Sequence, residues 1–438
     1  MGEKRLFGSK KRDLCRKTSL IVKMLKRVLS ILLVSSLGYA PAWASESALL
    51  AQFHPYREGA PRILGLEPEV ALSSDNAQLA REVLPAEVLR LLEAGDLSIT
   101  IQETTDLPPR PSYLDATVQY SQNVTLNGKG TPENYRAGAP FPLLDPADLQ
   151  AGEKLAWNLR YRDLGETFEM GANPRAVNPS GGVEYSNRGF MRYRFGMYRP
   201  NTADNDPQWQ EQGVFMKNSF EMLAPSDQEG SINIRTTYDD DGRATEQWRY
   251  SPQNRRTRKD HVNYITPIGG YYEMLQEEQP PLFFQGYLRA YQWMFRGARV
   301  MLVPGFLKTT ALHYEGKNGW YPQVPWELRQ VLVLECTPRQ FHPFGKRVFF
   351  LDQQTYTPLL ILTYNSAGAF VRLTITAHAH PSFHPGSNGV PLPLMVGVAW
   401  INYAKDRATL FDAGDSMTYN RPLAAQRFEL MEILRKGK

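Results

Sequence analysis

The stretch VFFLDQQTYTPLLILTYNSAG, residues 348–368, decides the fold. Two runs of aromatic, β-branched and aliphatic residues flank the polar segment DQQT, and a second turn follows at NSAG. Apolar runs bounded by Asp, Asn, Ser and Gly are typical of antiparallel strands joined by short turns. The stretch therefore predicts neighbouring strands of a sheet, which the next run, AFVRLTITAHAH, continues.

The same texture begins upstream, at about residue 153. In SINIRTTYDDDGRATEQWRYSP, residues 231–252, the pair Asp-Gly is a hairpin turn signal between two alternating runs. On the second run, Trp248 and Tyr250 share one face of the strand and Gln247 and Arg249 the other. The sequence thus predicts a meander of antiparallel strands over most of its length.

Helices are expected at two places. Residues 76–97, NAQLAREVLPAEVLRLLEAGDL, carry apolar residues at helical spacing, and Gly95 lies near a plausible end. Residues 281–301, PLFFQGYLRAYQWMFRGARVM, are the second helical candidate. Residues 106–145 are rich in Pro and irregular, which predicts a loop or a wrapping segment.

The first 44 residues predict export. A basic segment, an apolar run and small residues at Ala42 and Ala44 have the order of a cleavable signal peptide. Met24 is an alternative start, and a retained anchor is the alternative interpretation. The whole chain has a net charge of +5, but residues 1–44 hold ten Lys and Arg against two Asp and Glu, which leaves −3 for the rest. A slightly acidic mature protein excludes nucleic acid as the expected partner.

The mature chain is expected to be soluble, periplasmic and free of disulfides. Cys15 lies in the leader, so Cys336 remains alone, on a strand pattern typical of a buried, inert thiol. The apolar segment 392–404 is too short to span a membrane and is expected in the core.

A basic cluster at residues 255–259 follows the turn SPQN. As a strand, it would place Arg256 and Arg258 on one side and Arg255, Thr257 and Lys259 on the other. One interpretation is a solvated strand balanced by the acidic run 239–241. The other is a contact with an anionic ligand.

Catalytic motifs are missing from the sequence. It contains no G-x-S-x-G elbow, no P-loop and no dinucleotide fingerprint. His378 and His380, on one strand face, and His384, beyond a turn that contains Pro, are a possible metal set. However, His378 and His380 continue the polar face of Thr374 and Thr376, and no Cys and no supporting carboxylate lies close in sequence. We therefore expect no cofactor, no metal and no enzymatic activity.

The stretch 348–368 resembles the strand–turn–strand signature of periplasmic lipoprotein carriers of the LolA/LolB type. Its features are Asp352, Thr355, Pro358-Leu359, Tyr364 and Gly368. LAWNLRYRD (155–163), WRYSPQNRR (248–256) and FFQGYLRAYQWMFRGARVMLVP (283–304) resemble the domain-of-unknown-function 1329 family, and this similarity runs through about residues 135–375. The chain departs from that family at two turns, with Gln253 after Pro252 and Gly305-Phe306 after Pro304.

The resemblance implies an α+β fold in which a curved antiparallel sheet forms a half-open barrel with helices on its concave face. Together with the patterns above, it divides the chain into an expected signal peptide (1–44), an N-terminal helix and irregular arm (45–134) and a LolA-like domain (135–438). It also implies a hydrophobic cargo, an RND-type exporter and an outer-membrane partner.

We therefore expect a periplasmic carrier or chaperone for a lipid or other hydrophobic or amphiphilic molecule. The alternatives are a hydrolase or metal-dependent enzyme, and an adaptor that docks an exporter without a ligand. Arg256 and Arg258 are expected at an anionic headgroup. The residues expected to line the cavity are Trp157, Phe195, Tyr198, Trp248, Tyr250, Tyr291, Trp293, Phe349 and Leu351.

Overall fold

The computed structural model describes residues 42–429. Residues 1–49 and 50–438 separate into two compact units, of which the second holds the sheet. The predicted signal peptide lies outside the described residues apart from positions 42–44, with which helix α2 (Ala42–Phe53) begins. No helix within residues 42–429 is long and apolar enough to cross a bilayer.

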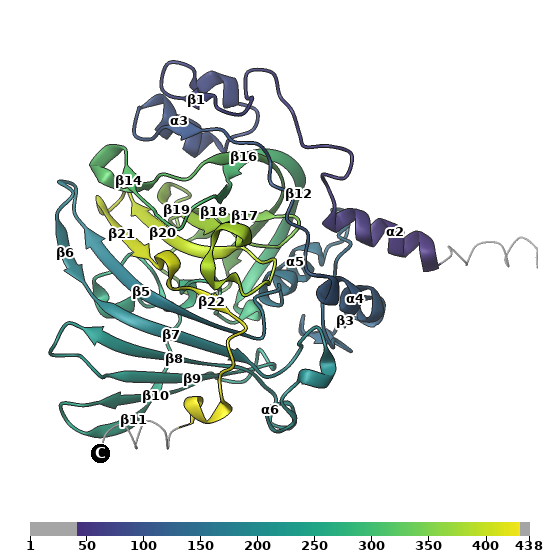
Figure 1. The fold of residues 1–438 in the computed structure, drawn as a ribbon, viewed down its shortest axis with the longest axis vertical. Helices are drawn as coiled ribbons and strands as arrows, with labels where there is room; N and C mark the ends of the chain where they lie inside the picture. The colour runs from purple at the N-terminus through teal and green to yellow at the C-terminus, as the bar shows by residue number, and fades with distance from the viewer. Residues whose placement is uncertain (1–41, 430–438) are drawn as a thin grey trace, which may run out of the picture. The chain divides into compact units, whose positions relative to one another are not determined.

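A sheet of sixteen strands, antiparallel except for the short strand β13, dominates the second unit (Figure 1). Its end strands, β11 and β12, do not pair with each other within the described residues, so the sheet curves without closing into a barrel. This confirms the predicted open half-barrel. Along the sheet, the strands are β11 (Arg256–His261), β10 (Glu246–Ser251), β9 (Ile232–Tyr238), β8 (Val214–Ala224), β7 (Arg188–Phe195), β5 (Thr167–Val177), β21 (Arg407–Asp412), β20 (Leu394–Asn402), β19 (Phe370–Ala379), β18 (Pro358–Tyr364), β17 (Lys346–Asp352), β16 (Trp326–Pro338) and β12 (Tyr291–Pro304).

The remaining elements are short. Beside the main path, β13 (Phe306–Leu307) pairs with β19, and β6 (Val183–Ser186) and β22 (Thr418–Tyr419) pair with β5. The small sheets join β1 (Ala71–Leu72) to β2 (Ile99–Thr100), β3 (Thr125–Leu126) to β4 (Pro132–Glu133) and β14 (Tyr314–Glu315) to β15 (Tyr321–Pro322). The other helices are α3 (Ala86–Glu93), α4 (Pro111–Tyr120), α5 (Ala151–Arg160) and α6 (Pro207–Glu211).

The hairpin of β17 and β18 forms where the sequence predicts it. Asp352 ends β17, and its carboxylate accepts hydrogen bonds from the main-chain N–H and the hydroxyl of Thr355, at 3.0 and 2.8 Å. The next turn, NSAG, is held by the Asn365 side chain and by Gly368, whose φ of 81° favours glycine. Polar side chains thus satisfy the turn backbone that the two strands leave unpaired.

The prediction of a second helix, over residues 281–301, is wrong. The structure has a short 3-10 turn, Leu288–Ala290, followed by strand β12. The start of β12 alternates between buried Tyr291 and Trp293 and exposed Gln292 and Met294, which is the period of a strand with one covered face. Aromatic residues at every second position therefore outweigh the apparent helical spacing.

The first predicted helix, residues 76–97, is interrupted. A 3-10 turn, Ala77–Ala80, precedes α3, and Pro85 lies at the N-cap of α3, within the range predicted as one helix, where its missing N–H interrupts helical hydrogen bonding. Gly95 adopts a φ of 73° just beyond α3, at the predicted end.

One face of the sheet, which we call the outer face, bears Phe350, Leu362 and Leu373. Leu362 and Leu373 are cross-strand partners, and the partner of Phe350 lies two residues before Leu362, on the same face. These side chains belong to one large buried cluster. The same cluster includes Trp320 and Tyr321 and, from the N-terminal segment, Val88 and Leu92. The N-terminal segment thus contributes to the main core.

The opposite, inner face bears Arg347, Arg372 and, six strands beyond Arg372, Arg235. Helix α5 packs on it against β12 and β16. A Cβ atom at Gly152 of α5 would lie 2.3 Å from the carbonyl oxygen of Trp293, so this close approach requires glycine. The rest of the cover is an irregular segment, residues 262–290, which we call the cover segment.

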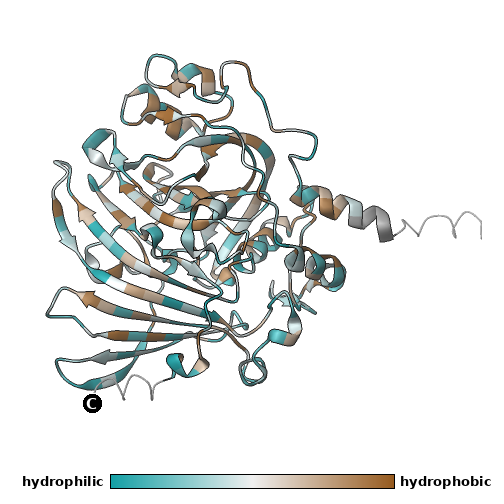
Figure 2. Cartoon of the chain, in the orientation of Figure 1, coloured by the Kyte–Doolittle hydropathy of each residue, from teal (hydrophilic) through white to brown (hydrophobic). Residues whose placement is uncertain are grey.

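The cover segment divides the sheet into two halves. Over β16–β21, which together with β12 we call the closed half, both faces are largely buried, whereas β12 is buried on both faces only at its end. Over β7–β11, the open half, burial alternates and falls away toward β11. Figure 2 shows hydrophobic residues concentrated in the closed half, and hydrophobic and hydrophilic residues alternating along the strands of the open half.

Candidate functional site

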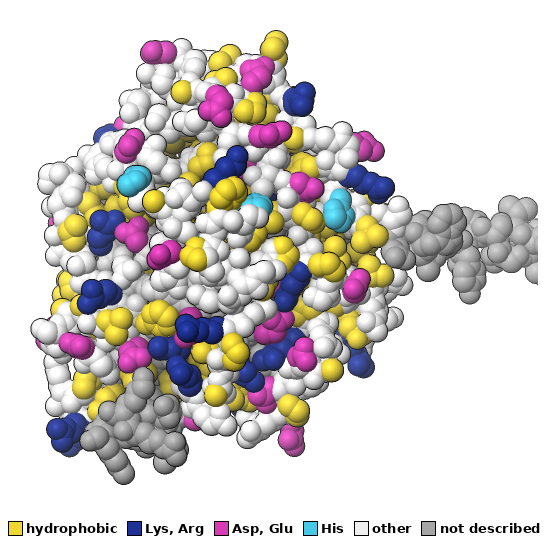
Figure 3. Space-filling model, in the orientation of Figure 1, with side chains coloured by type: hydrophobic (Ala, Val, Ile, Leu, Met, Phe, Trp, Pro, Cys, Tyr) yellow, Lys and Arg dark blue, Asp and Glu magenta, His cyan; other side chains and the backbone are white. Residues whose placement is uncertain are grey.

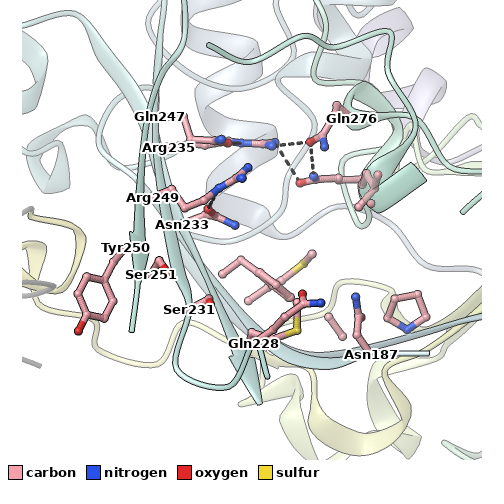
Figure 4. A pocket seen from close by; sticks show the side chains of 18 of the residues that line it. Asn187, Gln228, Ser231, Asn233, Arg235, Gln247, Arg249, Tyr250, Ser251 and Gln276 are labelled. Carbon is pink, nitrogen blue, oxygen red and sulfur yellow. Dashed lines mark hydrogen bonds between the residues drawn. The ribbon is translucent and has the colours of Figure 1, made fainter. Parts of the chain in front are cut away.

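A groove of about 1270 Å³ lies between the inner face of the open half and residues 268–279 of the cover segment (Figure 4). The strand positions that face it follow from the sheet register, because cross-strand partners share a face. One row runs through Gln247, Arg235 and Asn218. The groove therefore lies on the same face of the sheet that the cover segment closes elsewhere.

Apolar side chains occupy the neighbouring positions of the groove. The row next to Arg235 contains Phe220 and Met191, and Met222 lies one row further. The cover segment contributes Ile268 and Met274 from the opposite wall. One end of the groove is thus polar, and methionine and phenylalanine line the adjoining part.

Arg235 is the central group of the polar end. Its Nε donates to Oε1 of Gln247 at 2.6 Å and its Nη1 to Oε1 of Gln279 at 3.3 Å, and its Nη2 donates to Oε1 of Gln276 (Figure 4). Burial lowers the pKa of Arg235, and the charge of Arg249 lowers it further. A buried cation is thus held by neutral amides.

Exposed cations lie at the end of the groove next to β11. Arg256, Thr257 and Arg258 border it. Arg258 pairs with Asp260 at 3.1 Å, Arg249 pairs with the same carboxylate at 3.2 Å, and Lys259 pairs with Glu246. The balancing acids are therefore Asp260 and Glu246 rather than the predicted run 239–241.

Asp241, from that run, serves the fold instead. Its buried carboxylate accepts hydrogen bonds from the main-chain N–H groups of Leu288 and Arg289 at 3.1 and 2.9 Å. It thereby fixes the end of the cover segment beside the open half.

The predicted cavity residues lie in several places. Tyr250 belongs to the groove lining, but its ring points away from Arg235, Gln247 and Gln276 in Figure 4 and packs with Ile232 and Ile234. Trp248, on the same face of β10 as Tyr250, has Lys259 over its ring.

The other predicted aromatic residues pack against one another. Tyr291, Trp293 and Phe349 surround Phe284 of the cover segment, with ring centroids 5.0–6.4 Å from it. Trp157 stacks on Tyr161, which meets Tyr198. Phe195 contacts Phe215, and Leu351 is fully buried on β17. The structure thus packs the aromatic members of this group into clusters with other rings.

The sequence interpretation missed Arg235, Asn218 and the amides of the cover segment. A signal was present, because alternation in INIRTTY sets Asn233 and Arg235 on one face, as it does Gln247 and Arg249 on the next strand. What alternation cannot indicate is which segment covers that face.

The closed half has a different polar centre beneath the cover segment. Arg347 pairs with Glu277 at 2.6 Å and with Glu278 at 3.3 Å, and Arg372 also pairs with Glu278. Burial alone would raise the pKa of Glu277, but Arg347 and then His342 outweigh it and lower the pKa. This centre is fully compensated by charge.

The histidines at and after the end of β19 have different surroundings. His378 is buried, and burial lowers its pKa to about 3. His380 and His384 accept hydrogen bonds from the N–H groups of Ser382 and Gly386 in the following turns. Among residues 42–429 no group of three or more His, Cys, Asp and Glu side chains is placed to hold a metal. Cys336 is buried, which raises its pKa to about 12.

Solved structures resemble the chain at low identity. A domain from Vibrio parahaemolyticus assigned to the outer membrane lipoprotein-sorting proteins is 17% identical, with a TM-score of 0.45 over 66% of this chain and 100% of that one. A DUF1329 family protein from Desulfovibrio piger is 14% identical, with a TM-score of 0.44 over 66% of this chain and 99% of that one. A LolA superfamily protein from Nitrosomonas europaea is 10% identical, with a TM-score of 0.38 over 63% of this chain and 94% of that one.

No curated protein matches the sequence. The model of one family, described as protein of unknown function DUF1329, matches residues 71–430. The match extends on both sides of the segment 135–375 in which the motifs lie, and it takes in α3, the whole sheet and the groove. The chain therefore belongs to the DUF1329 family.

Proposed function

We propose that the protein is an exported, non-enzymatic carrier that holds a lipid or other amphiphilic molecule in the groove of the open half. The observation that carries this proposal is the groove of about 1270 Å³, open on a sheet whose other half is sealed on both faces. Binding sites for small molecules have volumes of about 300–1,000 Å³, so the groove has room for a ligand of lipid size.

The lining supports binding rather than catalysis. Among the described residues that line the groove, none is His, Cys, Glu or Lys, and the serines Ser231 and Ser251 have no imidazole beside them. Nucleophilic catalysis needs a base within hydrogen-bond reach of the nucleophile. Methionine and phenylalanine side chains instead offer an adaptable apolar surface.

We place the protein in the periplasm, on the basis of the predicted signal peptide. The resemblance to LolA-type carriers adds an RND-type exporter and an outer-membrane protein as the proposed partners. Figure 3 shows one face of the molecule with cationic and acidic side chains interspersed, a distribution that does not suit a polyanion such as nucleic acid.

The test is to purify the protein from periplasm without detergent and to identify co-extracted molecules by mass spectrometry. Uptake of the fluorescent apolar probe N-phenyl-1-naphthylamine is measured in parallel. We expect a bound amphiphile and saturable probe uptake. Protein that carries no amphiphile and takes up no probe would instead favour the ligand-free adaptor.

A matched pair of variants locates the site. Met222→Trp fills the groove, whereas Leu223→Trp adds the same bulk one residue further along β8, at a position 40% exposed on the opposite face. We expect the first variant to abolish probe uptake and the second to leave it unchanged. Equal uptake by both variants would exclude the groove as the binding site.

A further inference from the structure

We propose that the polar end of the groove is an anion site centred on Arg235, which takes the oxyanion headgroup of a single-chain amphiphile. The proposal rests on the proposed function, because the carried molecule supplies the anion. It specifies the chemistry of the cargo, and it assigns recognition to a buried residue rather than to the exposed cations of β11.

Comparison with the other buried arginines carries the inference. Arg329 pairs with Glu327 and Asp352, Arg347 with Glu277 and Glu278, and Arg372 with Glu278. Arg235 is 7% exposed and, within the described residues, has no ion pair. A charge buried without a counter-ion is strongly unfavourable, so the missing anion needs an explanation.

Arg162 is a second buried arginine without a counter-ion in the described chain, and its hydrogen-bond partners lie within the fold. It too is buried without an ion pair among the described residues, but it donates to the main-chain carbonyls of Leu159, Pro281 and Leu282. The cavities beside it measure about 30 and 10 Å³, which leaves no room for a ligand. Arg235, in contrast, borders about 1270 Å³.

The surroundings of Arg235 suit an exchangeable anion. Its partners are three glutamine side chains, whose amide groups can turn and donate their own N–H groups to an oxyanion. A guanidinium has five N–H donors, and three bonds are made here.

The charges around the groove are mostly positive. Among its lining residues are four cations, Arg235, Arg249, Arg256 and Arg258, and one acid, Asp227. Asp260 neutralises part of the charge of Arg249 and Arg258. No carboxylate of the described chain does so for Arg235, which therefore remains available for a charge-assisted pair with an oxyanion.

The apolar rows of side chains next to Arg235 indicate that the ligand also has an alkyl chain. Phe220 and Met191 lie one row from Arg235, and Met222 lies two rows away. With a headgroup on Arg235, an alkyl chain would extend along these side chains beneath Ile268 and Met274. A free inorganic anion would leave this apolar surface wet, so we commit to an amphiphile as the occupant.

The test is competition against bound N-phenyl-1-naphthylamine by decyl phosphate, 1-decanol and inorganic phosphate. We expect wild-type protein to bind decyl phosphate at least about tenfold more tightly than 1-decanol. Arg235→Gln should remove this preference, leave the affinity for 1-decanol unchanged and keep or raise the melting temperature. Arg299→Gln, at an exposed position of β12, is the control and should change nothing.

The outcomes separate this inference from the carrier proposal. Absence of probe binding would overturn both. Probe binding with equal displacement by decyl phosphate and 1-decanol would overturn the anion site alone, and this measurement needs only wild-type protein. Inorganic phosphate that binds as tightly as decyl phosphate would overturn the amphiphile as occupant. A large fall in the melting temperature of Arg235→Gln with an unchanged preference would make Arg235 a structural residue.

Discussion

The closed and open halves of the sheet present arginines on the same face to the same cover segment, with opposite results. Over the closed half, Glu277 and Glu278 meet Arg347 and Arg372. Over the open half, the adjacent residue Gln276 meets Arg235. Consecutive residues of one turn thus seal one half with carboxylates and leave the other with amides. The side chains of the cover segment, more than the strands, determine where a ligand can enter.

The largest expected difference between the halves is in packing. Phe349→Ala removes a fully buried ring from the cluster around Phe284 and should lower the free energy of unfolding by about 3–5 kcal/mol. Met222→Ala, in the groove, should lower it by about 1 kcal/mol or less. Chemical denaturation measures both variants. Equal losses would mean that the groove is packed as tightly as the core.

The second prediction breaks the charge compensation of the closed half. Glu277→Gln leaves Arg347 without its nearest carboxylate and should lower the free energy of unfolding by about 3 kcal/mol. Glu335→Gln, which loses the surface pair with Arg296, is the control and should cost less than about 1 kcal/mol. A loss for Glu277→Gln no larger than that of the control would contradict the importance of the buried network.

The third prediction converts the open half toward the closed one. Gln276→Glu places a carboxylate next to Arg235 and should raise the free energy of unfolding by about 1–2 kcal/mol. The same change should weaken the binding of decyl phosphate, because the new carboxylate forms an ion pair with the Arg235 guanidinium. Calorimetry and probe displacement measure the two effects. A less stable variant with undiminished affinity would show that Arg235 needs no counter-ion.

The fourth prediction concerns pH. The pKa of Glu277 is lowered in the folded protein from its ordinary value of 4.5, so its stabilising effect is present above that value and is lost as the pH falls below it. We expect the stability of the wild type to decline with acid more steeply than that of Glu277→Gln. Parallel slopes in denaturation at several pH values would argue against a charged Glu277.

The smallest effect is expected at the surface of the open half. Arg258→Glu changes a side chain that is 68% exposed and should alter the free energy of unfolding by less than about 1 kcal/mol. Decyl phosphate should bind a few-fold more weakly at low ionic strength, and added salt should remove the difference. A salt-independent loss as large as that of Arg235→Gln would move the anion site to β11.

Local pattern was sufficient to predict much of the sheet but little of the groove. The hairpin turns at Asp352 and Asn365 depend on neighbouring side chains, and the alternation in β9 and β10 sets their faces, so both follow from sequence. The path of the cover segment depends on long-range contacts such as that of Asp241 with Leu288, which no periodicity encodes. Most of the aromatic residues that we expected at the cavity pack against other rings, and the groove is lined by amides, methionines and a different set of aromatic residues, such as Phe220 and Tyr272.

Strand β11 also bears on how copies of the protein meet. As the last strand of an unclosed sheet, it has main-chain N–H and C=O groups that no further strand of the described chain pairs with. Such a border invites a strand from another molecule and is a common origin of aggregation. Here the border reads RTRKDH, so a second copy approaching it would bring like charges together. The sheet can therefore stay open for a ligand while the charges of β11 disfavour strand pairing between copies of the protein.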